Sequence, residues 1–411
     1  MTATPVEEIL EIGSWEDVRF VLRSRSFDQV APEDGYAEGT ELQYRIIGDS
    51  LVMARGEPHF ERRRIESTLF RLPTLLMYEH ELVEPRLHAR LDGLPVGPDG
   101  RPVGDVVEIG QDALLAVMAK LLGIDVSTPE REEHFRDIFT RLDSGSRVRH
   151  MIDMHQVLDE GLEVQREFNE TFWQPAWEAH EHALADVAAG RLDEAALPND
   201  LVTVMLRNRD HFAQWDDGVY LREATLYTAA SVGTTTRELA LCVEALEEWL
   251  LAHPEEEPRR TDTPFLAAAF AESCRLHQSV QDVGRTAMED VTLPSGTVVR
   301  AGRPVRVSLV GANRDLLGPT ADQFDPHRAV PPEGDSTGLA FSDGRHTCIG
   351  KLLVLGEGRA AGSDSGRLGT AVTILRELYA AGMRRDPYRA PTLKATTTKR
   401  YATYPVVFAP R

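Results

Sequence analysis

The sequence predicts a mainly α protein with a small β portion. Helical spacing of apolar residues recurs along most of the chain, over the segments 111–122, 156–186, 219–252, 264–277 and 370–381. Strand patterns are few, short and late in the chain. With 42% hydrophobic and 27% charged residues, the composition is that of an ordinary globular protein able to bury a large core.

Local signals mark where the predicted elements begin and end. In 111–122 the apolar side chains follow an i, i+3, i+4, i+7 stripe, and Gly123 stands where helices commonly end. Thr128, Pro129 and Glu130 then supply a cap residue, an N1 proline and a first-turn acid for another helix. The predicted strands, which lie between turns rich in glycine and proline, are 298–299, 305–309 and 404–408.

Charge and hydropathy exclude several classes of partner. Lys and Arg total 45 against 66 Asp and Glu, and the resulting net charge of −21 repels nucleic-acid phosphates and anionic lipid. No stretch approaches the ~18 apolar residues of a membrane span, and the first residues lack the pattern of a signal peptide. We therefore expect a cytoplasmic protein that binds neither nucleic acid nor membrane. Lysine is rare and alanine frequent, which indicates a GC-rich bacterial genome.

The three cysteines, Cys242, Cys274 and Cys348, are far apart and odd in number, so they form neither a disulfide framework nor a zinc site. Only Cys348 lies in a chemically suggestive segment, which reads FSDGRHTCIG from Phe341 to Gly350. Glycines let the backbone fold tightly around one sulfur, and a following helix start offers N–H donors that favour the thiolate. Such a thiolate could hold a soft metal, although a lone cysteine is usually a small buried hydrophobe.

This segment resembles the cysteine-ligand loop of the cytochrome P450 family, F-x-x-G-x-x-x-C-x-G, at every defining position from Phe341 to Gly350. The resemblance implies that Cys348 ligates the iron of heme b, that Phe341 packs near the sulfur and that His346 reaches a heme propionate. In this family the thiolate pushes electron density toward iron and favours O–O cleavage.

Further segments resemble the family in its own order along the chain. Glu272 and Arg275 form an E-x-x-R pair that alone would be an ordinary helix salt bridge. With Arg328, in the segment 324–328, the pair resembles the network that braces the heme-side fold. His59 and Arg63, four residues apart, resemble the helix face that holds a propionate; the alternative is a solvated basic face.

Arg285 stands where the family places another propionate arginine. In so acidic a chain, clustered arginines have added value as anion clamps.

The long helix predicted over 219–252 contains small and hydroxyl residues that are poor helix formers, and hydroxyls there can bond back to i−4 carbonyls and distort the helix. The segment resembles the family's oxygen-activating motif, A/G-G-x-D/E-T, in which Thr234 would organise protons. Two positions depart from the motif: Ser231 replaces the usual glycine and Gly233 replaces the usual acid. The ordinary proton route is therefore in doubt, with Ser231, other hydroxyls or water as substitutes.

The resemblance runs from about residue 14 to the end of the chain, as one domain over 1–411 with an abbreviated N-terminal β portion. The glycine-rich run 356–369 interrupts the long helix expected after the cysteine, on the face where electron donors dock. The resemblance also implies the segments that contact substrate: 28–57, 145–180, 226–231, 280–283 and 396–403.

The implied activity is a monooxygenase that uses O2, with electrons from a ferredoxin or flavodoxin and its reductase, to hydroxylate or couple a small organic substrate. Bacterial specialised biosynthesis is the expected setting. The main alternative is a catalytically silent relative that serves as a heme sensor or partner protein, which the missing acid at Gly233 favours.

Two other sequence patterns are candidate functional sites, and both are rejected. A dinucleotide fingerprint, G-x-G-x-x-A over 356–361, is followed by too few residues for its fold. His180 and His182 lie two residues apart, so they do not share a helix face for binding a metal.

Overall fold

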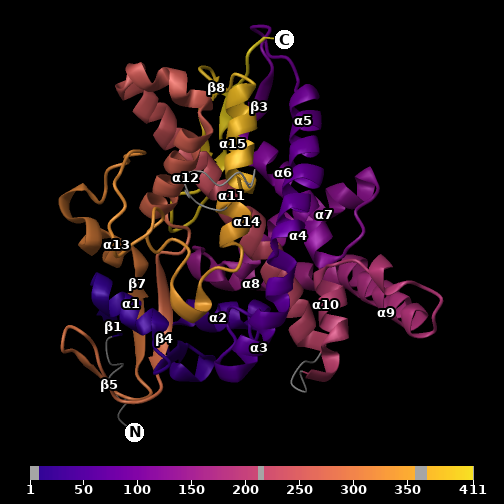
Figure 1. The fold of residues 1–411 in the computed structure, drawn as a ribbon, viewed down its shortest axis with the longest axis vertical. Coiled ribbons are helices and arrows are strands. Elements are labelled where there is room, and N and C mark those ends of the chain that lie inside the picture. The colour runs from indigo at the N-terminus through magenta and orange to yellow at the C-terminus, as the bar shows by residue number, and fades with distance from the viewer. Residues whose placement is uncertain (1–8, 212–216, 357–367, 411) are drawn as a thin grey trace.

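The computed structural model describes residues 9–211, 217–356 and 368–410, and helices build most of this fold (Figure 1). The α-helices are α1 Trp15–Arg23, α2 Glu38–Ile47, α3 Gly56–Glu66, α4 Leu72–Met77, α5 Glu84–Asp92, α6 Val106–Leu122, α7 Pro129–Ser146, α8 Met154–Phe168, α9 Gln174–Ala188, α10 Leu201–Arg207, α11 Asp217–Ala252, α12 Thr263–His277, α13 Leu309–Leu317, α14 Lys351–Leu355 and α15 Thr370–Ala380. The strands are β1 Leu10–Ile12, β2 Phe27–Gln29, β3 Val103–Asp105, β4 Asp282–Ala287, β5 Val291–Thr292, β6 Val298–Val299, β7 Pro304–Ser308, β8 Arg384–Arg385, β9 Thr392–Leu393, β10 Tyr401–Thr403 and β11 Pro405–Val407. The predicted fold class, mainly α with a small β portion, is confirmed.

The long helices follow the sequence predictions closely. Helix α6 contains the predicted stripe and ends at Gly123, whose φ of 83° is left-handed, as a C′ glycine requires. Thr128 caps α7 by accepting from Arg131 N. The predictions for 219–252, 264–277 and 370–381 match α11, α12 and α15 within two residues at each end. The segment 156–186 is instead divided into α8 and α9 by a π-helical turn, Asn169–Trp173.

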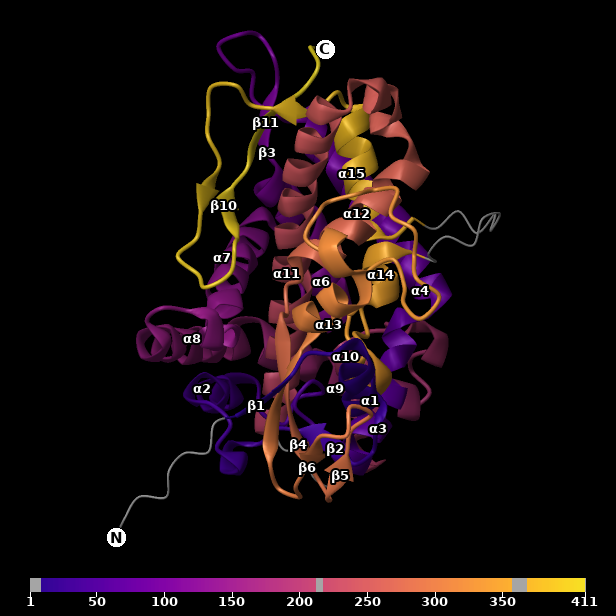
Figure 2. The ribbon, with the colours of Figure 1, turned by 90° about the vertical axis from the view of Figure 1, so that its left-hand side faces the viewer.

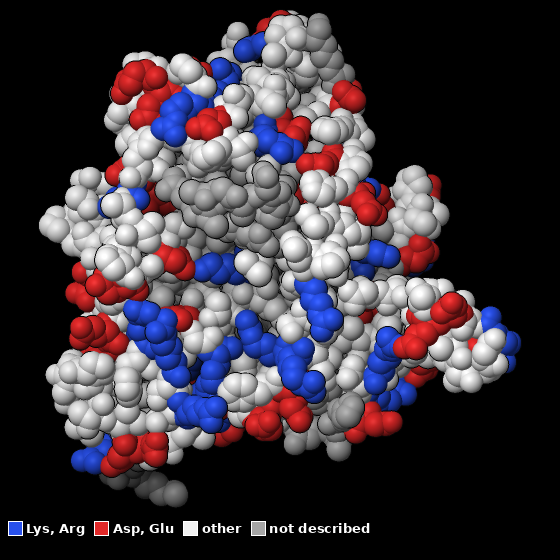
Figure 3. Space-filling model, viewed as in Figure 1, with Lys and Arg blue, Asp and Glu red and all other residues white. Residues whose placement is uncertain are grey.

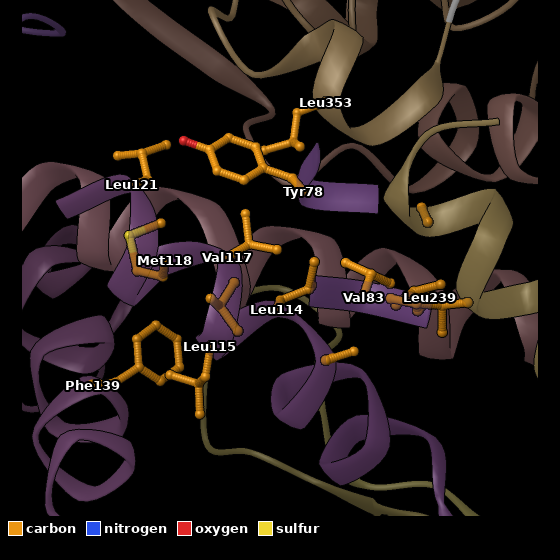
Figure 4. Close-up of a cluster of buried hydrophobic side chains, with 14 of the residues drawn as sticks. Tyr78, Val83, Leu114, Leu115, Val117, Met118, Leu121, Phe139, Leu239 and Leu353 are labelled. Carbon is orange, nitrogen blue, oxygen red and sulfur yellow. The ribbon is translucent and has the colours of Figure 1, made fainter. Parts of the chain in front are cut away.

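Helix α11 is the central element of the core. It packs against α6, α7 and α12, and Figure 2 shows it passing between α7 on one side and α12 and α14 on the other. Figure 4 shows the apolar side chains of α6 meeting Leu239 of α11, Tyr78 and Leu353 in the main buried cluster. Because burial of each large apolar side chain contributes about 1.5–3 kcal/mol, α11 is a firmly held scaffold for the residues that it carries.

The largest sheet has the strand order β1-β7-β4-β2 and lies at the end of the molecule opposite to the sheet β3-β11-β8 (Figures 1 and 2). Strand β4 runs antiparallel to β2, with Gln29 opposite Arg285. The predicted strands 298–299, 305–309 and 404–408 correspond to β6, β7 and β11. At the N-terminal end of the described chain, β1 and β2 are only three residues long.

The chain breaks its helix shortly after Cys348. Helix α14 ends at Gly356, with φ 71°, and α15 begins at Thr370; the rest of the predicted glycine-rich interruption, 357–367, lies outside the described residues. The apolar run before Gly356 is helical, so the strand that a dinucleotide fingerprint needs is not there. Among the described residues, no helix is both long and apolar enough to cross a membrane.

Candidate active site

The loop 341–350 holds the Cys348 sulfur in a tight turn of backbone. Cys348 N donates to Phe341 O at 2.9 Å, which closes the loop on itself. Gly344 has a φ of 69°, and a Cβ at this position would lie 2.8 Å from the carbonyl carbon of Leu22 in α1. Only glycine fits both conditions, so the motif glycine has a direct steric reason.

Ion pairs fasten the same loop to α1. Asp343 Oδ2 accepts from Arg23 Nε at 2.8 Å and from Arg19 Nε at 3.2 Å, while Asp343 Oδ1 accepts from Gly344 N at 2.7 Å. Pairing one carboxylate with two guanidinium groups keeps the loop against the helix.

The Cys348 side chain is accessible to solvent, yet enough protein surrounds it that burial raises the pKa of its thiol. The backbone N–H groups of Gly350 and Lys351 and the charge of Arg63 act in the opposite direction, toward the thiolate. The predicted donors are therefore present, but burial outweighs them. The other two cysteines are fully buried.

Two predicted residues from distant segments, His59 of α3 and His346 of the cysteine loop, lie against each other. Their ring centroids are 3.8 Å apart. Both nitrogens of His59 are buried without a hydrogen-bond partner, and His346 Nδ1 meets Gln29 Nε2 at 3.1 Å. Burial, together with nearby arginine charge, lowers the pKa of His59 to about 4 and that of His346 further, so both rings are neutral at pH 7.

Three arginine charges converge on these rings, from Arg63, Arg285 and Arg345. Arg285 is only 3% exposed and donates to neutral groups, Gln29 Oε1 and its neighbour's carbonyl, both at 2.7 Å. Burial lowers its pKa to about 10. Arg345 likewise donates to backbone carbonyls of β2 and the loop before it.

This cluster, which we call the cation cradle (His59, Arg63, Arg285, Arg345 and His346), fits an anionic ligand. The carboxylate of Asp28 acts on it, but both oxygens of Asp28 already accept backbone N–H groups. Buried positive charge is costly unless a counter-charge meets it, and an unpartnered buried imidazole costs further free energy. Carboxylates of a bound group would satisfy both needs.

Sequence reasoning missed Arg345 and Gln29 as members of this site. Arg345 occupies a variable position of the loop motif, although its place beside His346 could have drawn attention to it. Gln29 could not be found from sequence, because it reaches the site through the pairing of β2 with β4.

The predicted Glu272, Arg275 and Arg328 network is present and buried. Arg275 donates to both oxygens of Glu272, at 2.7 and 2.8 Å, and Arg328 Nε donates to Glu272 Oε1 at 2.8 Å. Arg275 also donates to Ala321 O at 2.7 Å and Arg328 to Gln323 O at 2.7 Å. One carboxylate thus joins α12 to the segment 321–328.

Helix α11 carries the predicted oxygen-side residues Ser231, Gly233 and Thr234. Thr234 Oγ1 donates to Ala230 O at 2.7 Å and Ser231 Oγ to Tyr227 O at 3.0 Å, so the predicted i−4 bonds form, yet the helix is not interrupted there. Ala230 is exposed and Thr234 half-buried, although the helix runs through the core. This strip of α11 is therefore partly accessible to solvent.

A buried acidic pair between α3 and α11 was not found by sequence reasoning. Glu66 Oε2 accepts from Tyr227 Oη at 2.7 Å, while Glu223 Oε2 accepts from Leu51 N at 2.8 Å and Arg62 Nη1 at 3.1 Å. Burial raises the pKa of Glu223 to about 7 and that of Glu66 well above its ordinary value, and the charge of Glu223 raises the pKa of Glu66 further. Both were hidden because isolated glutamates carry no motif.

Hydrogen bonds bring several of the predicted substrate segments together. Met151 forms a β-bridge with Thr396, and Thr397 N donates to His150 O at 3.1 Å, which joins 145–180 to 396–403. Arg149 Nη2 donates to Asp282 O at 3.0 Å, which adds 280–283. His180, in contrast, lies elsewhere and pairs with Asp200 at 2.9 Å; no metal cluster of His, Cys, Asp or Glu occurs in the described part of the chain.

Comparisons with known proteins agree with this geometry. Residues 244–355, which include Glu272 and Cys348, match the family model "Cytochrome P450". Cytochrome P450 105C1 from a Streptomyces species is 36% identical over 141 residues, which span about a third of this chain and 34% of that protein. The ultra-long-chain fatty acid omega-hydroxylase of Homo sapiens is 25% identical over 404 residues, which cover 89% of this chain and 73% of that protein.

Solved structures match along nearly the whole chain. CYP109E1 from Bacillus megaterium, solved with testosterone, superposes with a TM-score of 0.68 at 17% identity and covers 98% of this chain and 94% of its own. CalO2 superposes with a TM-score of 0.69 at 20% identity, over 98% and 92% of the two chains. The architecture is therefore that of a cytochrome P450. The segment that matches the family model, residues 244–355, contains the cysteine loop.

Proposed function

We propose that this protein is a heme-thiolate monooxygenase that inserts one oxygen atom from O2 into a small organic substrate or couples it oxidatively. The observation that carries the proposal is the cation cradle beside a solvent-accessible cysteine thiol, two features that match the two carboxylates and the iron of heme b. Bound heme supplies the chemistry of two-electron O2 activation. Cys348 would be its ligand, and Phe341 and Gly350 shape the loop around the sulfur.

The residues of this chain have distinct tasks in that proposal. Arg63, Arg285 and His346 would hold the propionates through charge-assisted hydrogen bonds, and His59 would satisfy its unpartnered nitrogens there. Thr234 Oγ1 donates to a helix carbonyl and keeps lone pairs free, so it can accept and pass on a proton on the solvent-accessible side of α11. Glu272, with its two arginines, would keep the cysteine side of the fold rigid.

An electron donor would dock on a basic face. Figure 3 shows Lys and Arg gathering in the lower half of one face, over α1 and α3, in a chain whose net charge is −21. We propose an acidic ferredoxin or flavodoxin, served by a reductase, as the donor, because charge complementarity raises the rate of such encounters. A role in bacterial specialised metabolism would fit one structural neighbour, which belongs to a study of P450-like monooxygenases of microbial secondary metabolism.

The test of heme-thiolate function is the spectrum of the reduced CO complex. Wild-type protein should show the red-shifted Soret band, and Cys348→Ser should abolish it, because that band needs a thiolate opposite CO. Cys242→Ser and Cys274→Ser should leave it unchanged. Persistence of the band in Cys348→Ser would show that the sulfur ligand is misassigned. A difference-spectrum screen of small organic compounds then identifies the substrate class.

The missing acid at Gly233 favours a second candidate, a catalytically silent heme sensor or partner protein. Oxygen-dependent turnover of a screened substrate, with a competent electron donor, separates the two. Heme binding without turnover would favour the sensor.

A further inference from the structure

The space beside Gly233 is filled by a carboxylate from another helix. A Cβ built on Gly233 would overlap Asp143 Oδ1, and it would lie 2.7 Å from Asp143 Cγ and 2.9 Å from Arg147 Nη2. Real Cβ atoms do not approach heavy atoms so closely. Asp143 belongs to α7, so the volume that a side chain at position 233 would take is occupied by an acid from 90 residues earlier in the chain.

Two arginines hold Asp143 in this position. Asp143 is 2% exposed; its Oδ1 accepts from Arg147 Nε at 2.7 Å, and its Oδ2 accepts from Arg400 Nη2 at 2.5 Å. Burial by itself would raise the pKa of Asp143, but the charges of Arg147, Arg400 and Lys394 outweigh it and hold the pKa below its ordinary value. The carboxylate is therefore ionised at pH 7.

The same group reaches the backbone of α11 beside Thr234. Arg147 Nη2 donates to Ala229 O at 3.3 Å, and the next carbonyl, Ala230 O, accepts from Thr234 Oγ1. Arg400 precedes β10, and Lys394 N donates to its carbonyl at 2.9 Å, so Asp143 also fastens the C-terminal hairpin. One buried carboxylate thus joins α7, α11 and the segment 394–403.

We propose that Asp143 is a positioning residue for Thr234, supplying from α7 the carboxylate that the family motif places at position 233. Asp143 orients Arg147, Arg147 fixes the carbonyl of Ala229, and the turn of α11 that carries the Thr234 hydroxyl is held in one arrangement. The proposal rests on the proposed monooxygenase function, and it explains why position 233 is glycine: either helix can contribute the acid, but not both.

The experiment compares four proteins loaded with heme: wild type, Asp143→Asn and two double variants. The carboxylate exchange combines Asp143→Gly with Gly233→Asp, and the apolar control, the alanine exchange, combines Asp143→Ala with Gly233→Ala. The first readout is amide hydrogen exchange over 229–237, which needs no turnover. The second is the pH profile of the rate at which O2 reoxidises dithionite-reduced protein, for which the alanine exchange is the control for altered packing.

In Asp143→Asn, the amide hydrogens of 229–237 should exchange several-fold faster than in the wild type, and the pH profile of the reoxidation rate should change. The carboxylate exchange should restore both properties, because Asp at 233 begins close to Arg147. The alanine exchange fills a similar space but leaves Arg147 and Arg400 without a counter-charge, so it should recover neither property.

The proposal is overturned if Asp143→Asn has the same hydrogen exchange and the same pH profile as the wild type. It is also overturned if the alanine exchange recovers both properties fully. Should the carboxylate exchange fail to fold, Asp143→Asn still decides, because asparagine keeps the shape of aspartate. Absence of the thiolate CO band in the wild type would reject the proposed function instead, while the hydrogen-exchange comparison would still test the hold of Asp143 on α11.

Discussion

Replacing Glu272 by Gln tests how strongly its network braces the fold. The carboxylate is 3% exposed and faces Arg275, which is 6% exposed, through two short hydrogen bonds, with Arg328 on one of the same oxygens. Glutamine keeps the shape but leaves two guanidinium charges without a counter-charge. Removing one partner of a buried ion pair costs about 3–5 kcal/mol. Because Arg275 retains the carbonyls of Ala321 and Gln323, we expect the lower part of this range.

The expected change in thermal midpoint follows from the size of the chain. With an unfolding entropy of about 2.1 cal/mol/K per residue over 411 residues, a loss of about 3–4 kcal/mol lowers the midpoint by about 3–5 °C. Circular dichroism of purified protein at equal heme content measures it. The matched control is Asp322→Asn, which breaks the exposed Asp322–Arg314 pair and should shift the midpoint by about 1 °C or less. A Glu272→Gln midpoint equal to that of the control would refute the bracing role.

Three further predictions concern the heme, the buried acids and the oxygen side. Arg285→Ala or Arg63→Ala should each lose a charge-assisted bond of about 1.5–3 kcal/mol and release heme about 10- to 100-fold faster to an acceptor apoprotein; full heme retention in both would reject the propionate assignment. Since the pKa of Glu223 is raised to about 7, its protonated form stabilises the fold below about pH 4.5, and this contribution is lost as pH rises through 7. Glu223→Gln should therefore show a smaller fall in thermal midpoint between pH 6 and 8 than wild type, and parallel curves would contradict the raised pKa. Thr234→Ala should release more peroxide per NAD(P)H consumed with the true substrate, whereas unchanged coupling would make Thr234 a helix residue only.

The parts of the fold that sequence predicted are those in which local pattern and tertiary packing agree. The stripe of α6 is long enough for its period to be read, and Gly123 and Thr128 have the conformations that their residue types favour. Strands β1 and β2 are three residues long, too short for an alternating pattern, and they are fixed by partners 295 and 256 to 260 residues away, respectively. The π-helical turn after α8 likewise leaves no mark on the helical period.

The candidate site divides in the same way. The cysteine loop could be predicted because backbone constraints concentrate its glycines and sulfur within ten residues. The cation cradle was predicted only in part, since its member Arg345 and the neighbouring Gln29 reach the site through the contact of the loop with β2. Glu66 and Glu223 come together only when α3 packs on α11.

Position 233 shows why a linear motif can misjudge chemistry. The sequence alone suggests that Gly233→Asp restores a missing acid and changes coupling. In the structure the new side chain would meet the Asp143 carboxylate, so the single substitution combines steric overlap with repulsion between two buried acids. A change in coupling in Gly233→Asp would therefore say nothing about proton delivery. Moving the carboxylate from 143 to 233 keeps the number of charges and the filled volume similar. That double variant therefore tests whether the acid must stand on α7, or whether any acid between the two helices is enough.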